Sequence, residues 1–355
     1  MNQRILIIRL SALGDIINTL PVVPLLRRYC PDLAIDWVVE DRFQDFVKLV
    51  DGVDQCIPFP RQSARPTPSG LKALLSHRSN LRGRSYLAAI DFQGNLKGAI
   101  HLFFARAGRK IGLERAASRE GAHLFARERV LPPEGCHRAE RALALLRPIC
   151  DSIPEPLSGN GLGEALRPRI LEDPLSAQSV EQRLTQLRTD TGPLVVLHPG
   201  TSKFGAFKRW HPRGFGELAR RLSTESGALV LVSYGPGERP LAQAVVDASS
   251  GSARFFEPSH GLPGLVALLR RADLVVAADS GPLLLASALG TRTVALFGPK
   301  NPRVYAPPFG GCTVVRHPVP CSPCSLRRCE DPICMSGIEP ERVFQAALPA
   351  CLKSG

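Results

Sequence analysis

The 355-residue sequence has little that would place it in a membrane or direct it through one. Its apolar runs, such as 274–278 and 294–298, are far shorter than the ~20 residues that a helix needs to cross a bilayer. Arg4 and Arg9 interrupt the apolar stretch at the N-terminus and Asp15 closes it, so that stretch does not resemble a secretory signal peptide. We therefore expect a soluble, intracellular protein.

Aromatic residues and cysteines are also scarce. Ten cysteines in a chain of this length are too few for a disulfide scaffold. Basic residues are in excess, because 45 Lys and Arg against 32 Asp and Glu give a net charge of +13, which indicates an anionic partner. The aromatic content of 6% and the absence of a recognised binding motif argue against nucleic acid as that partner. A hydrophobic content of 44% excludes wholesale disorder.

The order of apolar runs predicts two similar α/β halves. Buried strands are expected at residues 4–10, 34–40 and 86–92, and again at 194–198, 228–233, 274–278 and 293–297. Helical segments alternate with these strands, which is typical of doubly wound sheets that bind ligands at the carboxyl ends of their strands. One helix, 16–30, contains Pro21, which disfavours a continuous helix there. The Pro- and Gly-rich stretch 153–193, with a helix at about 177–188, is expected to join the halves.

The first predicted strand ends in the turn Ser11-Ala-Leu-Gly14-Asp15. This turn lacks the G-x-G-x-x-G pattern of dinucleotide-binding proteins. Asp15 would lie at a helix N-terminus, where a carboxylate commonly caps the helix or, facing a cleft, serves as a general base. The turn alone favours the cap.

Three turns in the second half share the position at the carboxyl end of a predicted strand. They are residues 198–202, 235–238 and 279–281. Backbone N–H groups, hydroxyls and the nearby Lys208 suit a pyrophosphate, and Glu238 suits ribose hydroxyls, so together the turns indicate a nucleotide site. For the flanking Lys203 and Arg209, an ordinary solvated basic loop stays open as the alternative.

Four cysteines near the C-terminus have spacings that can surround one zinc ion. They are Cys321, Cys324, Cys329 and Cys334. The spacing differs from the standard zinc-knuckle pattern, so two interpretations stay open: a structural zinc site, or a set of reduced loop cysteines that form disulfides only on oxidation.

Taken together, the chain resembles the lipopolysaccharide heptosyltransferases of glycosyltransferase family nine. The matching segments, in chain order, are 4–15, 19–21, 36–40, 91–97, 198–201, 208–210, 279–281 and 296–299. Residues 36–40 and Arg119 look most like heptosyltransferase I, whereas Cys321-Ser-Pro-Cys324 looks more like heptosyltransferase II. We favour the first because its residues lie in the acceptor-binding half.

The resemblance implies the GT-B architecture, in which two Rossmann-like doubly wound domains face a central cleft. Residues 1–165 would bind the acceptor and residues 166–338 the nucleotide sugar. Residues 339–355 would form a helix that returns toward the first domain. The implied partners are an ADP-heptose donor, a Kdo–lipid A type acceptor and the anionic inner face of the inner membrane. The implied location is cytoplasmic, with peripheral membrane association.

The resemblance also implies an inverting transfer of heptose to the inner core of lipopolysaccharide. Asp15 would be the general base, and Lys208 would stabilise the leaving group. The other implied donor-binding residues are Thr201, Ser202, Glu238, Asp279, Ser280 and Gly281, and the acceptor-binding residues are Ser11, Gly14, Lys97 and Arg119. No cofactor is required for catalysis, although a structural zinc is possible.

One position departs from the family pattern. Leu284 stands where the family usually carries a His, three residues after the Gly of the Asp-Ser-Gly turn. A donor-site polar contact is therefore missing, which leaves two alternatives open: a paralogue that uses another nucleotide sugar or acceptor, and a non-catalytic protein that binds nucleotides or glycans.

Overall fold

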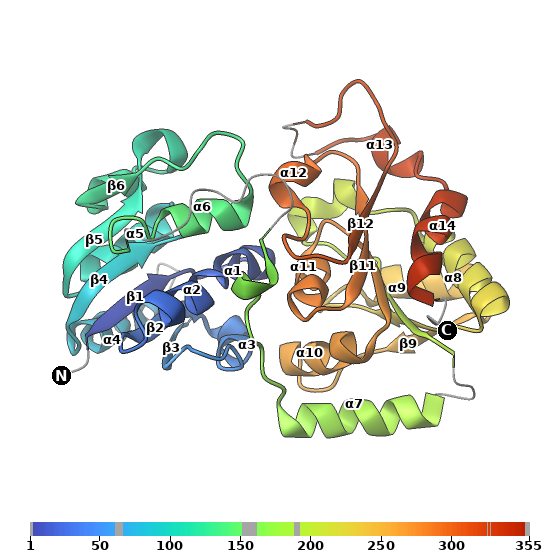
Figure 1. The fold of residues 1–355 in the computed structure, drawn as a ribbon, viewed down its shortest axis with the longest axis horizontal. Helices are drawn as coiled ribbons and strands as arrows, with labels where there is room; N and C mark the ends of the chain where they lie inside the picture. Colours follow the sequence, from blue (N-terminus) through green and yellow to red (C-terminus); the bar gives the residue numbers. More distant parts are fainter. Residues whose placement is uncertain are drawn as a thin grey trace. The chain divides into compact units, whose positions relative to one another are not determined.

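The computed structural model describes residues 3–60, 67–150, 162–187, 192–324, 326 and 328–351. The chain divides into two compact units, Met1–Leu171 and Glu172–Gly355 (Figure 1). No helix in the described ranges is both long and apolar enough to cross a membrane. Parts of the predicted connection, namely 153–161 and 188–191, lie outside these ranges.

The first unit contains a parallel six-stranded sheet in the order β3-β2-β1-β4-β5-β6. The strands are β1 (Arg4–Ile8), β2 (Ala34–Glu40), β3 (Gln55–Phe59), β4 (Tyr86–Asp91), β5 (Ala107–Leu113) and β6 (Glu128–Val130). The predicted strands at 4–10, 34–40 and 86–92 are confirmed as β1, β2 and β4. Ile8 pairs with Asp91, so β1 and β4 end side by side at the centre of the sheet.

The α-helices of this unit lie between its strands, except the last, which follows β6. They are α1 (Leu13–Thr19), α2 (Val22–Tyr29), α3 (Gln44–Val47), α4 (Pro68–Arg82), α5 (Leu96–Phe104) and α6 (Arg138–Ala144). The helix predicted for 16–30 is divided into α1 and α2 at Leu20 and Pro21. Proline has no N–H to continue the hydrogen bonds of a helix interior, which explains the break.

The second unit repeats this plan, with a parallel sheet in the order β12-β11-β10-β7-β8-β9. The strands are β7 (Leu194–His198), β8 (Leu229–Ser233), β9 (Ala253–Phe256), β10 (Leu274–Ala278), β11 (Arg292–Phe297) and β12 (Cys312–Arg316). Counted within each unit, both sheets have the strand order 3-2-1-4-5-6 of the Rossmann fold. The expected pair of Rossmann-like doubly wound units is therefore confirmed.

The second unit contains α-helices before, between and after its strands. They are α7 (Pro174–Leu187), α8 (Pro212–Ser226), α9 (Arg239–Ala248), α10 (Leu262–Arg271), α11 (Gly281–Ala288), α12 (Pro302–Tyr305), α13 (Ile333–Ser336) and α14 (Pro340–Cys351). The helix predicted at 177–188 is α7, and its expected last residue, 188, lies outside the described ranges.

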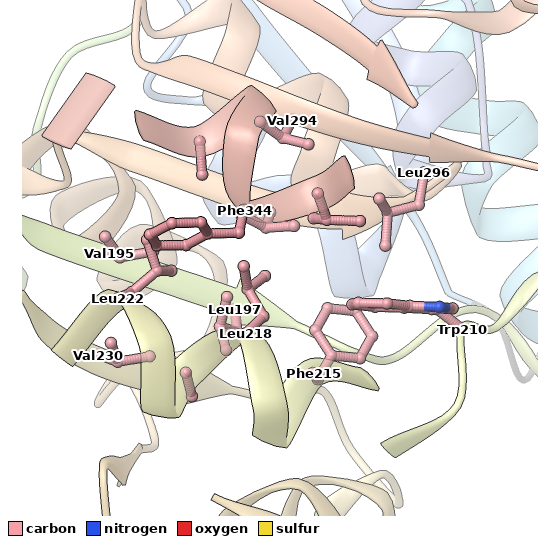
Figure 2. Packing of buried hydrophobic residues seen from close by; sticks show 14 of the residues in the cluster. Val195, Leu197, Trp210, Phe215, Leu218, Leu222, Val230, Val294, Leu296 and Phe344 are labelled. Carbon is pink, nitrogen blue, oxygen red and sulfur yellow. The ribbon is translucent and has the colours of Figure 1, made fainter. Parts of the chain in front are cut away.

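The final helix, α14, contacts α8 and strands β10 to β12 of its own unit. Figure 2 shows its Phe344 beside Leu222 of α8 and Val195 of β7, in a cluster that also holds Trp210 and Phe215. The Trp210 indole N–H donates to the carbonyl of Ile338, just before α14, at 2.9 Å. The expectation that this helix reaches toward the first domain stays a prediction.

Candidate functional site

A pocket of about 340 Å³ lies in the first unit, where β1 and β4 end. Its walls come from the turn after β1, the loop after β4, the segment after β5 and helix α6. The charged side chains of its lining are one carboxylate and four guanidinium groups: Asp15, Arg9, Arg119, Arg138 and Arg141. This excess of positive charge suits an anionic ligand.

Asp15 lies in the first turn of α1 and its side chain is 43% exposed. The helix is capped by Ala12 without any side-chain hydrogen bond, so Asp15 is not its N-cap. Instead, Arg9 Nη2 lies 2.8 Å from Asp15 Oδ1, and Arg9 also donates to the carbonyl of Phe92. The nearly buried Arg9 thus fixes the carboxylate at the pocket wall and leaves it accessible.

Two further side chains hold the loops around Asp15. The amide oxygen of Gln93 accepts hydrogen bonds from the backbone N–H groups of Leu10 at 3.1 Å and Ser11 at 3.3 Å. Asp91 accepts from the N–H groups of Gln93 at 2.9 Å and Gly94 at 3.2 Å. Burial raises the pKa of Asp91 to about 6, although these bonds and Arg9 oppose the shift. The loops after β1 and β4 are therefore joined into one wall of the pocket.

Arg141 of α6 donates to the carbonyl of Ala117, in the segment after β5 that also lines the pocket. Burial lowers the pKa of Arg141, and the neighbouring guanidinium groups of the pocket lower it further. These cations repel one another across the pocket. A ligand with negative charge would relieve this repulsion.

The predicted acceptor residues do not all line this pocket. Arg119 does. Lys97 is more than half exposed and lies 3.8 Å from Glu40, which also pairs with Arg42 at 2.7 Å. Ser11 and Gly14 belong to the turn that carries Asp15, but neither is among the residues of the lining.

In the second unit, Lys208 and Asp279 form an ion pair between the ends of η6 (Lys203–Lys208) and β10. Lys208 Nζ donates to both the side-chain oxygen Oδ2 and the backbone carbonyl of Asp279, each at 2.8 Å. Ser280 is the N-cap residue of α11, and its buried hydroxyl has no hydrogen-bond partner among the described residues. Gly281 begins the helix. This end of the sheet thus offers a cation, a hydroxyl and the N–H groups of a helix N-terminus to an anion.

Glu238 joins the other two predicted turns. Its carboxylate accepts from the Gly235 N–H at 3.0 Å and lies 3.8 Å from Arg209 Nη2. It covers Gly200 so closely that a Cβ at that position would lie 2.0 Å from Glu238 Oε2, which only glycine avoids. The turns 198–202 and 235–238 therefore meet as the sequence indicated.

Thr201 and Arg209 stabilise the first of these turns. The buried Thr201 hydroxyl donates to the Gly205 carbonyl at 2.9 Å and accepts from Arg209 Nε at 3.2 Å. Arg209 also donates to the Thr201 carbonyl at 2.9 Å. Its side chain therefore stabilises the turn and is not simply part of a solvated loop. Ser202 precedes η6, and its carbonyl accepts from the Gly205 N–H at 2.7 Å.

Leu284 is buried in the second turn of α11.

The sequence did not indicate Arg9, Arg138 and Arg141 as pocket residues. The two on α6 are three residues apart, which places them on one helix face, and this spacing was the available signal.

The four clustered cysteines are free thiols. Burial raises the pKa of Cys334, and the thiols of Cys321, Cys324 and Cys329 raise it further, so the four lie within electrostatic range of one another. Within the described residues, no group of three or more His, Cys, Asp or Glu side chains could hold a metal ion. The structural zinc therefore stays a prediction that this arrangement of the thiols does not support.

Comparison with known proteins agrees with this architecture. The model of glycosyltransferase family 9 (heptosyltransferase) matches residues 74–333. Lipopolysaccharide heptosyltransferase 1 of Pseudomonas aeruginosa is 28% identical, over 96% of this chain and 96% of that protein. The structure of E. coli heptosyltransferase WaaC with ADP-2-deoxy-2-fluoro heptose is 25% identical with a TM-score of 0.74, over 98% of this chain and 99% of that one.

A family 9 glycosyltransferase from Veillonella parvula has a TM-score of 0.80 at 20% identity, over 100% of this chain and 99% of that one, and shows the same fold. The resemblance noted from the motifs, including the similarity to heptosyltransferase I, is thus confirmed, and with it the GT-B class of fold. Because the family model spans well over half of its length, the chain belongs to glycosyltransferase family 9, the heptosyltransferases, and is a glycosyltransferase.

Proposed function

We propose that this enzyme transfers heptose from ADP-heptose to the Kdo-containing inner core of lipopolysaccharide, with inversion at the anomeric carbon. The observation that carries the proposal is the pocket of the first unit, where one exposed carboxylate stands among four guanidinium groups. Such a pocket suits an acceptor that carries both acidic groups and a hydroxyl to be deprotonated. The relatives named lipopolysaccharide heptosyltransferase 1 support lipopolysaccharide as the acceptor, and the similar structure of heptosyltransferase WaaC with ADP-2-deoxy-2-fluoro heptose supports the donor.

Asp15 is the general base of this proposal. Its carboxylate takes the proton of the acceptor hydroxyl while that oxygen attacks the anomeric carbon of the heptose. The bond from the anomeric carbon to the ADP phosphate oxygen breaks, and ADP leaves with the electron pair. Arg9 keeps Oδ1 of Asp15 in place, and the second carboxylate oxygen remains for the proton.

Lys208 and the N-terminus of α11 receive the charge that develops on ADP. An ammonium group has three N–H donors, and Asp279 accepts two of those of Lys208. The third is then left for a phosphate oxygen, together with the Ser280 hydroxyl. Glu238 would hold the ribose hydroxyls. These fixed groups do the work that a divalent cation does in other transferases, so we propose that none is required.

We further propose that the enzyme works in the cytoplasm at the inner face of the inner membrane, where a lipid-anchored acceptor would be available.

One observation favours a second candidate function, transfer from another nucleotide sugar. Leu284 is buried where the family usually carries a His, which is compatible with a different nucleotide sugar.

The test measures ADP release and product formation with a Kdo–lipid A acceptor and several nucleotide sugars, and reads the anomeric configuration of the product by NMR. We expect turnover with ADP-heptose and an inverted linkage. Turnover only with another nucleotide sugar would favour the second candidate, and a retained linkage would reject the single-displacement mechanism.

Replacing Arg119 with Gln is expected to raise the KM for the acceptor about 10- to 100-fold, because one charge-assisted hydrogen bond contributes about 1.5–3 kcal/mol. The KM for the donor should stay unchanged, since Arg119 belongs to the pocket of the first unit. Initial rates with each substrate varied in turn measure both constants. Arg220→Gln, which removes an exposed guanidinium of α8, is the matched control. An equal rise in both KM values would contradict the assignment.

A further inference from the structure

Positive charge is strongly segregated in the first unit. Residues 55–113 contain ten Lys and Arg but a single acidic residue, Asp91. Asp91 is buried, so it does not offset these charges at the surface. This segment includes α4, α5 and β5.

Helix α4 exposes a stripe that is apolar at one end and basic at the other. Leu71, Leu75, Arg78 and Arg82 follow one another at helical spacing and lie on one line along the helix. Leu71 is 59% exposed and Leu75 51% exposed. The buried residues of the helix, Gly70, His77 and Leu81, lie on an adjoining side, about a quarter turn away from the stripe. The exposed leucines are therefore not part of the core.

The stripe continues onto α5 and β5. Phe103 of α5 is 56% exposed. Lys110 Nζ donates to the Phe103 carbonyl at 3.0 Å and lies 5.8 Å from its ring centroid. On the α4 side, the Arg78 guanidinium lies 5.9 Å from the ring of Phe104. Burial lowers the pKa of Lys110, and the charges of Arg127 and Arg82 lower it further.

Together these residues form a continuous surface that we call the α4–α5 face. Its members are Leu71, Leu75, Arg78, Arg82, Phe103 and Lys110. In the part of the chain that the structure describes, no carboxylate forms an ion pair with Arg78, Arg82 or Lys110. The face thus combines uncompensated positive charge with large apolar side chains open to water.

We propose that the α4–α5 face docks the enzyme on the surface of an anionic lipid bilayer. Leucine and phenylalanine side chains enter the boundary between headgroups and acyl chains, while flexible basic side chains reach the lipid phosphates. Unneutralised Lys and Arg side chains are attracted to an anionic bilayer, each strengthening binding about fivefold. The choice of a membrane as the partner rests on the proposed function, in which the acceptor is lipid-anchored. The residues of the face do not depend on that function.

The test measures binding of the full chain to sedimented vesicles of phosphatidylcholine, with and without 30% phosphatidylglycerol. We expect binding only to the anionic vesicles, weakening as salt is raised. The triple variant Arg78→Gln, Arg82→Gln and Lys110→Gln should bind about 100-fold more weakly. Leu71→Ser with Leu75→Ser should also weaken binding but leave its dependence on salt unchanged.

The control triple variant removes three exposed charges from the second unit, through Arg213→Gln, Arg220→Gln and Arg254→Gln. It has the same net charge as the test variant and should bind vesicles like the wild type. Equal losses in both triple variants, or no loss in the first, would overturn the proposal. Displacement of the protein from vesicles by random duplex DNA at equal phosphate concentration would also overturn it, in favour of nucleic acid.

Circular dichroism and thermal melting establish that each variant is folded. Turnover on a deacylated, water-soluble acceptor should be the same in all of them, because no residue of the face lines the Asp15 pocket. Vesicle binding without turnover would count against the proposed function alone. Turnover without vesicle binding would count against the α4–α5 face alone.

Discussion

Asp15→Asn is expected to lower the turnover number about 10²- to 10⁴-fold, which is the usual contribution of a general base. The amide has nearly the same shape as the carboxylate but cannot take a proton from the acceptor hydroxyl. ADP should bind as tightly as before, because the residues proposed to hold it belong to the second unit. Stopped assays of ADP release give the rate, and calorimetric titration with ADP gives the affinity.

Asp45→Asn is the matched control for this change. Asp45 is an exposed carboxylate of the same unit, paired only with Lys48 at 3.1 Å among the described contacts. The control should turn over like the wild type. Undiminished turnover of Asp15→Asn would remove Asp15 from the role of base, and loss of ADP binding would indicate a wider structural change.

Lys208→Met is expected to lower the turnover number about 10²- to 10³-fold, as when one fixed donor to a developing negative charge is removed. Methionine retains an unbranched apolar side chain, so packing should change little. The affinity for ADP should fall as well, because the N–H donor proposed for a phosphate oxygen is lost. Steady-state rates and ADP titration measure the two effects.

The variant Asp279→Asn distinguishes the effect of the Lys208 charge on turnover from the effect of its ion pair with Asp279. This variant removes the carboxylate but keeps the ammonium group and the backbone carbonyl that accepts from it. We expect a smaller loss than in Lys208→Met, with partial rescue in Lys208→Arg. Equal losses in Asp279→Asn and Lys208→Met would show that Lys208 acts only by holding the Asp279 turn.

The central strands could be predicted because a parallel strand buried on both faces is a nearly continuous apolar run. β1, β7 and β10 are such runs. The outer strands could not be predicted in this way. β6 is only three residues long and carries Glu128 and Arg129, and in β5 the basic pair Arg109 and Lys110 interrupts the pattern.

The candidate site was predictable where a motif brings its own residues together. The turns at 198–202, 235–238 and 279–281 are local in sequence, and the structure joins the first two through Glu238. The cationic pocket was not predictable. Its guanidinium groups come from the turn after β1, from the segment after β5 and from α6, and only the pairing of strands in the folded sheet places them around one cavity.

The charges of the two sites are balanced in different ways. Lys208 is already paired with Asp279, and Arg209 lies near Glu238. The lining of the pocket in the first unit holds four guanidinium groups and one carboxylate. Dissolved ions shield an open cluster of like charges far more than they disturb close ion pairs. Binding of an acidic acceptor should therefore weaken as ionic strength rises, while binding of the nucleotide changes little. The ionic composition of the cell would then control the affinity for one substrate and not for the other.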